Sequence, residues 1–148
     1  MKNKIFSIII MFAVLAVFAA CDEDADHELE NIIKEKGGYF PVISSLSLEM
    51  PDEEANPGET LTLDLRYWSQ GEMESIVLME ALDDGALSEV DRVDYQPAYS
   101  SVTRTDSLLL NYQVPSNLSD TTSVKLKVQV INLNELTKAD SVIFNVYP

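Results

Sequence analysis

Cysteine and histidine are almost absent from this 148-residue chain, which contains one of each. A single cysteine excludes a disulfide framework and a cysteine-rich zinc site. A single histidine excludes multi-histidine metal sites and disfavours a histidine-dependent triad. Basic residues are also scarce, because 10 Lys and Arg stand against 25 Asp and Glu and give a net charge of −15. Since phosphate binding needs clustered Lys and Arg, nucleic acid is not an expected partner.

Catalytic motifs are missing as well. The chain has no Gly-x-Ser-x-Gly elbow, no P-loop, no His-Glu-x-x-His and no dinucleotide fingerprint. A two-carboxylate glycosidase is formally possible. However, the acidic residues gather in turns such as residues 52–54 and 83–84, where solvation explains them. We therefore expect no enzyme activity, no cofactor and no metal site.

The first twenty residues have the pattern of a secretory signal peptide. Lys2 and Lys4 give a positive start, residues 5–20 are uncharged and largely apolar, and Ala19 and Ala20 close the run. The run is short for a membrane span, which needs about 20 apolar residues. An uncleaved N-terminal anchor helix is the alternative interpretation.

The only cysteine lies where this signal ends. The segment Phe18-Ala19-Ala20-Cys21 resembles the bacterial lipobox, in which a signal peptidase cuts before a cysteine that becomes lipidated. The lipobox usually has Leu where this chain has Phe18. The resemblance implies that Cys21 carries the lipid, and several acyl chains anchor a protein firmly to a membrane.

An acidic run follows at residues 22–26, Asp-Glu-Asp-Ala-Asp. One interpretation is a solvated, extended tether, which continues to residue 38. The run also resembles the export signal that sends Bacteroidota lipoproteins to the outer face of the outer membrane. In proteobacteria, Asp directly after the cysteine instead implies retention at the inner membrane. We expect the protein to be located on the surface of the outer membrane.

From residue 39 to residue 148, apolar residues tend to recur at every second position, which is typical of β-strands. Residues 74–82 hold a more continuous apolar run that fits a buried strand or a short helix, and its β-branched start and its length favour a strand. One or two edge strands are expected within residues 88–101, around Pro97. The other predicted strands are residues 44–50, 60–68, 106–114, 123–131 and 140–147.

This pattern predicts an all-β domain of about seven short strands separated by turn signals, which fits a two-sheet sandwich. The cysteine pair of antibody domains is absent. The expected fold is therefore an Ig-like or fibronectin-III-like β-sandwich without a disulfide. An up-and-down barrel is the competitor and would need longer, more uniform strands.

Together, the lipobox, the acidic tether, Gly37-Gly38, residues 108–115 and the last two strands resemble small Ig-like surface lipoproteins of Bacteroidota. Such proteins are often encoded beside starch-utilisation-type importers, each a TonB-dependent barrel with a lipoprotein lid. The resemblance implies a surface location and a link to nutrient uptake, with the importer complex or a glycan as partner.

A binding face is suggested by one aromatic side chain. If the leucines of residues 60–68 face the core, Trp68 faces outward in the same row as Arg66. A flat aromatic ring with a polar edge suits a sugar ring, and Tyr95 and Tyr99 could join it. The alternative is that Trp68 is tucked under a loop as core, because a bulge reverses the facing. Tyr67 and Tyr112 are predicted to be core.

Three short motifs resemble the general O-glycosylation site of Bacteroidota, Asp-[Ser/Thr] followed by an apolar residue or Thr. Their acceptors would be Ser107, Thr121 and Ser141. Asp-Ser and Asp-Thr pairs also mark junctions between turns and strands, which is the alternative.

The expected function is therefore that of a lipid-anchored surface module that binds a glycan or assists an outer-membrane importer. A structural or adhesive Ig-like surface protein with no small ligand is the alternative from another class.

Overall fold

The computed structural model describes residues 37–50 and 54–148. This part of the chain is all-β and contains no helix. Residues Gly38–Pro148 form one compact unit. Its strands are β1 (Val42–Glu49), β2 (Glu54–Ala55), β3 (Thr60–Trp68), β4 (Met73–Leu82), β5 (Ser88–Asp94), β6 (Tyr99–Ser100), β7 (Thr105–Gln113), β8 (Thr122–Asn132) and β9 (Thr137–Val146).

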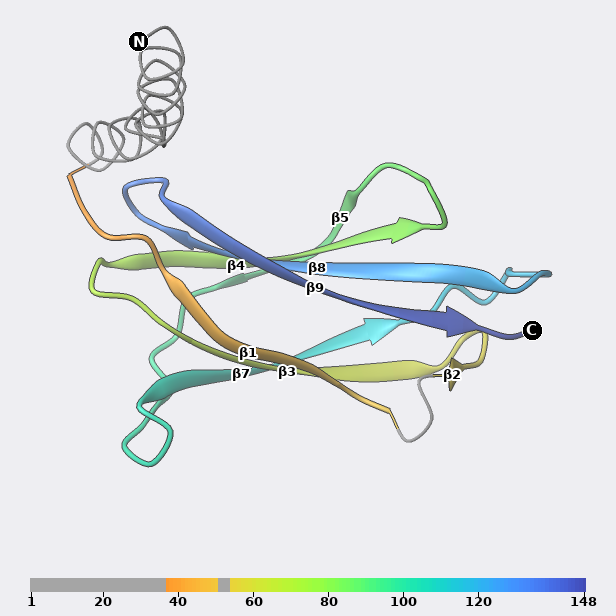
Figure 1. The fold of residues 1–148 in the computed structure, drawn as a ribbon, viewed down its shortest axis with the longest axis horizontal. Coiled ribbons are helices and arrows are strands. Elements are labelled where there is room, and N and C mark those ends of the chain that lie inside the picture. Colours follow the sequence, from red (N-terminus) through yellow and green to blue (C-terminus); the bar gives the residue numbers. More distant parts are fainter. Residues whose placement is uncertain (1–36, 51–53) are drawn as a thin grey trace, which may run out of the picture. The chain divides into compact units, whose positions relative to one another are not determined.

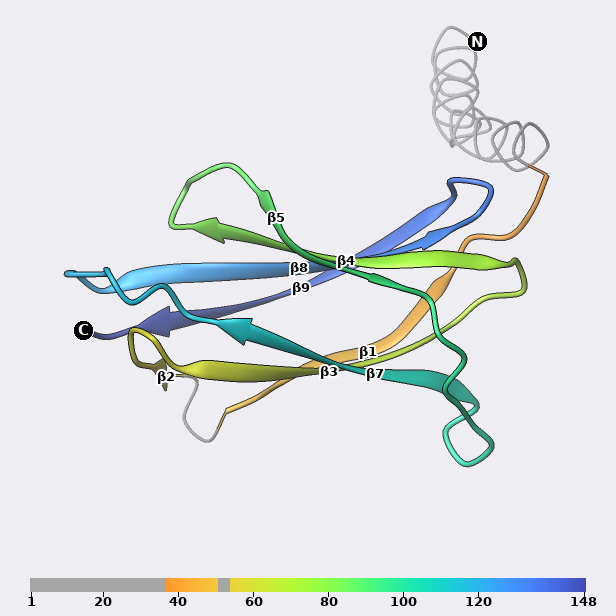
Figure 2. The same ribbon diagram turned by 180° about the vertical axis from the view of Figure 1, so that it is seen from behind.

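Two sheets make up this unit in a β-sandwich-like arrangement (Figure 1). One sheet has four strands in the order β1-β3-β7-β6, and the other has five in the order β2-β9-β8-β4-β5. Every pairing is antiparallel except that of β2 with β9. The view from behind shows β5 at the border of the five-stranded sheet (Figure 2). The described residues thus form two separate sheets rather than an up-and-down barrel.

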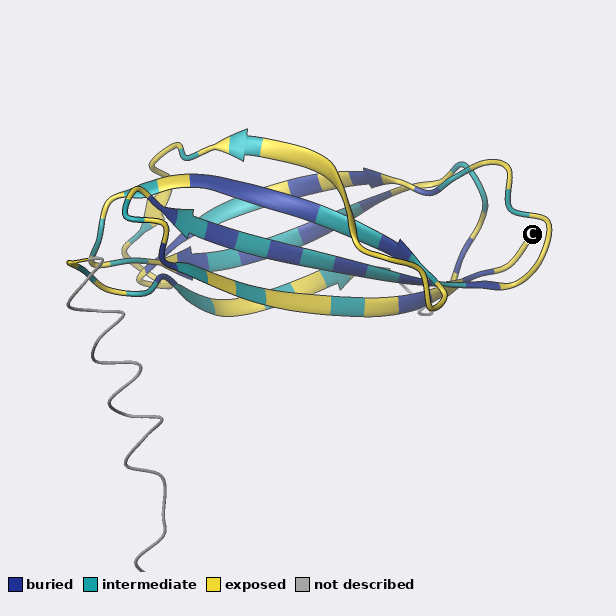
Figure 3. Cartoon of the chain, turned by 90° about the horizontal axis from the view of Figure 1, so that it is seen from above, coloured by how far each residue is buried: buried dark blue, intermediate teal, exposed yellow. Residues whose placement is uncertain are grey.

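The core fills the space between the sheets and is built by alternation. On β3, Leu61, Leu63 and Leu65 are buried, and on β8 every second residue from Val124 to Val130 is buried. Figure 3 shows this as bands of buried and less buried residues along the strands. Packing these side chains between two sheets removes them from water, and this removal contributes most of the free energy that stabilises such a fold.

The predicted strands agree well with the observed ones. Residues 60–68 form β3 with the predicted bounds, and the ambiguous run at residues 74–82 is strand β4. The weakly patterned segment yields two strands, β5 and β6, and both lie at sheet edges, as expected around Pro97. Strand β2 was not predicted, because two residues are too few to show a period.

One buried amide ties separate parts of the unit together. Asn132 ends β8 and is fully buried, and its Nδ2 donates hydrogen bonds to the backbone oxygen of Tyr39 (2.8 Å) and to Oγ of Ser69 (2.9 Å). These bonds join the segment before β1 and the β3–β4 turn to the β8–β9 hairpin.

No helix in the described ranges is long and apolar enough to cross a membrane.

Candidate functional site

The outer face of the four-stranded sheet carries the residues of β3 that alternate with its core leucines. The β3–β7 register places Arg66 opposite Ser107 and Asp64 opposite Leu109. On the other side, β1 places Ser45 beside Arg66. The face is therefore mostly polar, and its side chains on β3 and β7 are Thr62, Asp64, Arg66, Trp68, Ser107, Leu109, Asn111 and Gln113.

Arg66 lies on this face and is held on two sides. Its Nε and Nη2 donate to the two carboxylate oxygens of Asp64, each at 2.8 Å. Its Nη1 donates to Oγ of Ser107 at 3.0 Å. The hydrogen bonds to Asp64 raise the pKa of the guanidinium. A bidentate pair of this kind is directional, so the face presents a fixed, charge-balanced set of polar groups.

Trp68 ends the same row of β3. The residue is 37% exposed and pairs with Val42 of β1. Burial alternates along β3 up to its last residue, and the preceding Tyr67 is 1% exposed, so Trp68 is directed outward. Between the two interpretations of this residue, the structure selects the outward one. A partly exposed indole in the same row of β3 as Arg66 offers an apolar surface on a mostly polar face.

Tyr95 and Tyr99 do not lie on that face. Tyr67 pairs with Asp106 and Asp106 pairs with Tyr99, so Tyr99 is on the inner side of its sheet, although it is 65% exposed at the periphery. The ring of Tyr95 packs edge-to-face on Tyr67 with centroids 6.4 Å apart, and its hydroxyl donates to Asp106 at 3.3 Å. Arg66 and Trp68 therefore share the outer face of β3, whereas both tyrosines lie away from that face.

The buried tyrosines have structural partners. Burial, followed by the nearby Asp106 carboxylate, raises the pKa of Tyr67 to about 12. The hydroxyl of Tyr112 donates to Glu80, and burial together with this bond raises the pKa of Tyr112. Both rings are almost fully buried, as predicted. Both hydroxyls stay protonated at neutral pH, so they offer no tyrosinate nucleophile.

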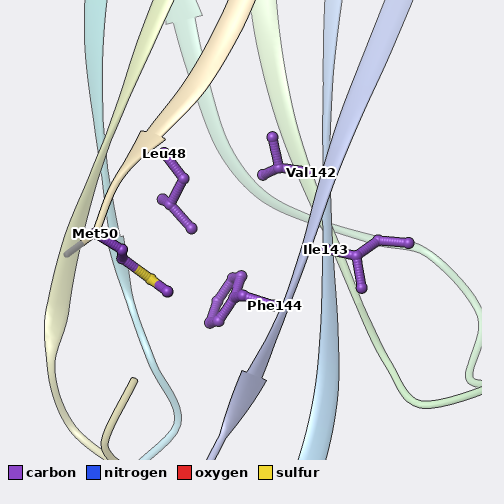
Figure 4. Close-up of a pocket in the computed structure, with 5 residues that line it drawn as sticks. All are labelled: Leu48, Met50, Val142, Ile143 and Phe144. Carbon is purple, nitrogen blue, oxygen red and sulfur yellow. The ribbon is translucent and has the colours of Figure 1, made fainter. Parts of the chain in front are cut away.

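The two sheets leave a hollow at each of their two seams. The first, of about 310 Å³, lies between β1 and β9. Figure 4 shows that Val142 and Phe144 project from one side of β9 toward Leu48 and Met50, whereas Ile143 projects from the other side. All five lining residues are apolar, so no polar side chain of this hollow could orient a sugar.

The second hollow, of about 260 Å³, lies at the opposite seam, between β7 and the β4–β5 pair. Unlike the first, it mixes carboxylate, amide and apolar groups. Its lining residues are Leu78, Glu80, Val90, Asp91, Asn111, Tyr112 and Gln113.

The three acceptor residues for O-glycosylation differ in their surroundings. Ser107 is half-buried within β7 and accepts the hydrogen bond from Arg66. Thr121 is exposed in the loop before β8, and Ser141 is exposed on β9. Exposure makes Thr121 and Ser141 more accessible to a modifying enzyme than Ser107.

Cys21 and the acidic run at residues 22–26 lie outside the described residues. Within the described residues, no group of three or more Asp, Glu, His or Cys side chains is placed to hold a metal ion.

The sequence patterns did not single out Asp64 and Ser107 as partners of Arg66. The Asp64 contact was available in principle, because residues two apart on a strand share a face. The Ser107 contact depends on the β3–β7 register, which the sequence does not show.

Comparison with known proteins yields few similarities. No family model matches the chain, and no curated protein does. The crystal structure of Spo0M, a sporulation control protein from Bacillus subtilis, is similar over 76% of this chain with 12% sequence identity and a TM-score of 0.48. This chain spans half (50%) of that protein's length.

Proposed function

We propose that this protein is a lipid-anchored module on the outer-membrane surface that binds a glycan on the outer face of its four-stranded sheet. The observation that carries the proposal is the outward row on β3, which contains the Asp64–Arg66 pair and the partly exposed Trp68. A sugar has apolar ring faces and hydroxyl edges. Trp68 can stack on the face, and the fixed polar groups beside it can bind the hydroxyls.

We also propose that the fold is of the Ig-like type. The orders β1-β3-β7-β6 and β2-β9-β8-β4-β5 match the two sheets of an Ig-like domain in which the first strand is shared between the sheets. The parallel pairing of β2 with β9 supports this, because β2 continues the chain after β1 and lies in the other sheet. Such a domain presents its faces and loops for binding while its core stays closed.

The membrane anchor in this proposal is the lipid on Cys21, and the acidic run after it directs the protein to the cell surface. The wider role is that of an accessory to a TonB-dependent nutrient importer. No finding on the described residues bears on this role, which depends on the lipobox-like segment and the acidic run.

Replacing Trp68 by Ala is expected to weaken retention on the bound polysaccharide at least about tenfold, because the stacking surface is lost, and tenfold corresponds to about 1.4 kcal/mol. The measurement is affinity electrophoresis of the lipoprotein in a panel of polysaccharide gels. Tyr147→Ala is the matched control, since Tyr147 is a similarly exposed aromatic (41%) on another strand end. Unchanged retention of the Trp68 variant would contradict the stacking role, and no retention of the wild type on any glycan would favour a structural or adhesive protein.

The importer role has a separate test. The lipoprotein, tagged after Pro148 and extracted in mild detergent, is expected to co-purify with a TonB-dependent barrel and its lid lipoprotein, which mass spectrometry would identify. An unrelated tagged lipoprotein from the same cells is the control. Recovery of this protein alone would count against an accessory role and leave a free-standing surface module.

A further inference from the structure

The edge of β7 is open over most of its length. Strand β6 pairs with β7 only at Thr105 and Asp106, and residues 107–113 have β3 as their sole strand partner in the described part of the chain. Val114 directs both its N–H and its C=O toward the β3 side, where it bonds to Glu59 and Gly58. Because backbone groups alternate sides along a strand, those of Ser107, Leu109, Asn111 and Gln113 point to the open edge.

This edge lacks the features by which sheets avoid pairing with other chains. Charged residues, prolines and bulges are the usual means, and residues 107–113 (Ser-Leu-Leu-Leu-Asn-Tyr-Gln) contain no charge and no proline. The β3–β7 register runs without a shift. The exposed side chain of Leu109 (60%) adds an apolar surface beside the edge.

The other edges are protected. Strand β1 has an irregularity in its register between Ile43 and Ser45. Strand β5 has an irregularity in its pairing with β4 and carries a run of charged residues, Glu89, Asp91, Arg92 and Asp94. Strand β9 carries Lys138 and Asp140 on the part that β2 does not cover. The open edge of β7 is therefore distinct among the described strands.

The 260 Å³ hollow lies directly beside this edge and carries carboxylates. The β4–β5 register places Asp91 opposite Leu78, on the inner side of its sheet. The carboxylate of Glu80 accepts a hydrogen bond from the hydroxyl of Tyr112. The hollow is lined by these two carboxylates and by no Lys or Arg. A strand added along β7 would direct every second side chain into this hollow and the alternate ones over Leu109.

We propose that the β7 edge binds an extended segment of a partner protein in which basic residues alternate with apolar ones. The segment adds a strand to the four-stranded sheet through the backbone groups of Leu109 and its neighbours. Its basic side chains enter the hollow toward Asp91 and Glu80, and its apolar side chains cover Leu109. Strand addition of this kind takes affinity from main-chain hydrogen bonds and specificity from the alternate side chains. A second copy of this chain fits less well, because both copies are strongly acidic.

The test uses the full lipidated protein in mild detergent and two synthetic peptides, one alternating Lys with Val and the other alternating Glu with Val. The Lys-Val peptide is expected to bind at least tenfold more tightly in fluorescence anisotropy. It should also slow amide hydrogen exchange in the segment containing residues 107–113. Absence of Lys-Val binding, or equal binding of the Glu-Val peptide, would overturn the proposal.

Variants separate the edge from general charge attraction. Leu109→Pro removes an edge donor without touching the β3 ladder and should reduce Lys-Val binding at least tenfold, whereas Leu109→Ala should keep most of it. Asp91→Lys changes an exposed side chain and should weaken Lys-Val binding and narrow its advantage over the Glu-Val peptide, because one of the two carboxylates of the hollow is replaced by a cation. This variant remains informative if the proline variant does not fold. Unchanged binding in both Leu109→Pro and Asp91→Lys would overturn the proposal. A concentration-dependent dimer that Leu109→Pro abolishes would overturn it in favour of self-pairing.

Discussion

Leu110→Ala is expected to lower the free energy of unfolding by about 3 kcal/mol, because it removes a buried side chain from the centre of the core. Leu110 is 2% exposed and lies opposite Leu63 in the β3–β7 pair. Both residues belong to the same cluster as Leu126 of the facing sheet. A cavity at this point therefore affects both layers, and a sandwich of this size has few other contacts with which to compensate.

The neighbouring residue offers a matched control. Leu109→Ala makes the same chemical change one position earlier, where the side chain is exposed on the outer face, and should change the free energy of unfolding by no more than about 0.5 kcal/mol. Urea denaturation of the non-lipidated chain would measure both variants. Equal losses for Leu109→Ala and Leu110→Ala would contradict the burial of Leu110 and the exposure of Leu109, and a larger loss for Leu109→Ala would mean that the two faces of β7 are assigned the wrong way round.

Cys21→Ser is expected to move the protein from the membrane fraction to the soluble fraction. A serine hydroxyl cannot form the thioether that lipidation requires, and each buried CH₂ of an acyl chain contributes about 0.8 kcal/mol to membrane binding. Because the chain has no other cysteine, no second site could take over the anchor. Cell fractionation would measure the distribution, and the intact mass of the purified wild type would show the added lipid.

A control variant distinguishes the proposed lipid anchor at Cys21 from the proposed surface-export signal in the acidic run. Asp22→Asn combined with Glu23→Gln keeps the cysteine and should remain in the membrane fraction, with reduced digestion by protease added outside the cells. If the Cys21→Ser variant stays in the membrane fraction instead, an uncleaved N-terminal helix holds the protein there.

The candidate site could be predicted in part. The strict alternation of β3 indicated that Arg66 and Trp68 share a face, and the structure places both there. Tyr95 and Tyr99 come from a segment without a clear period, so the sequence contained no information on their facing. The structure turns both toward the inner side, where Asp106 accepts a hydrogen bond from Tyr95. The pairing of Arg66 with Ser107 also required the register of two strands that are 41 residues apart.

By itself, the sequence determined the all-β class, the bounds of β3 and the core positions of Tyr67 and Tyr112, because a period of two records burial on one side of each strand. Only the tertiary structure decided the strand order, the outward placement of Trp68 and the open edge of β7. The physical reason is that alternation describes one strand at a time. Which strand pairs with which, and how far, depends on contacts between residues distant in the chain, and those contacts form only when the two sheets pack.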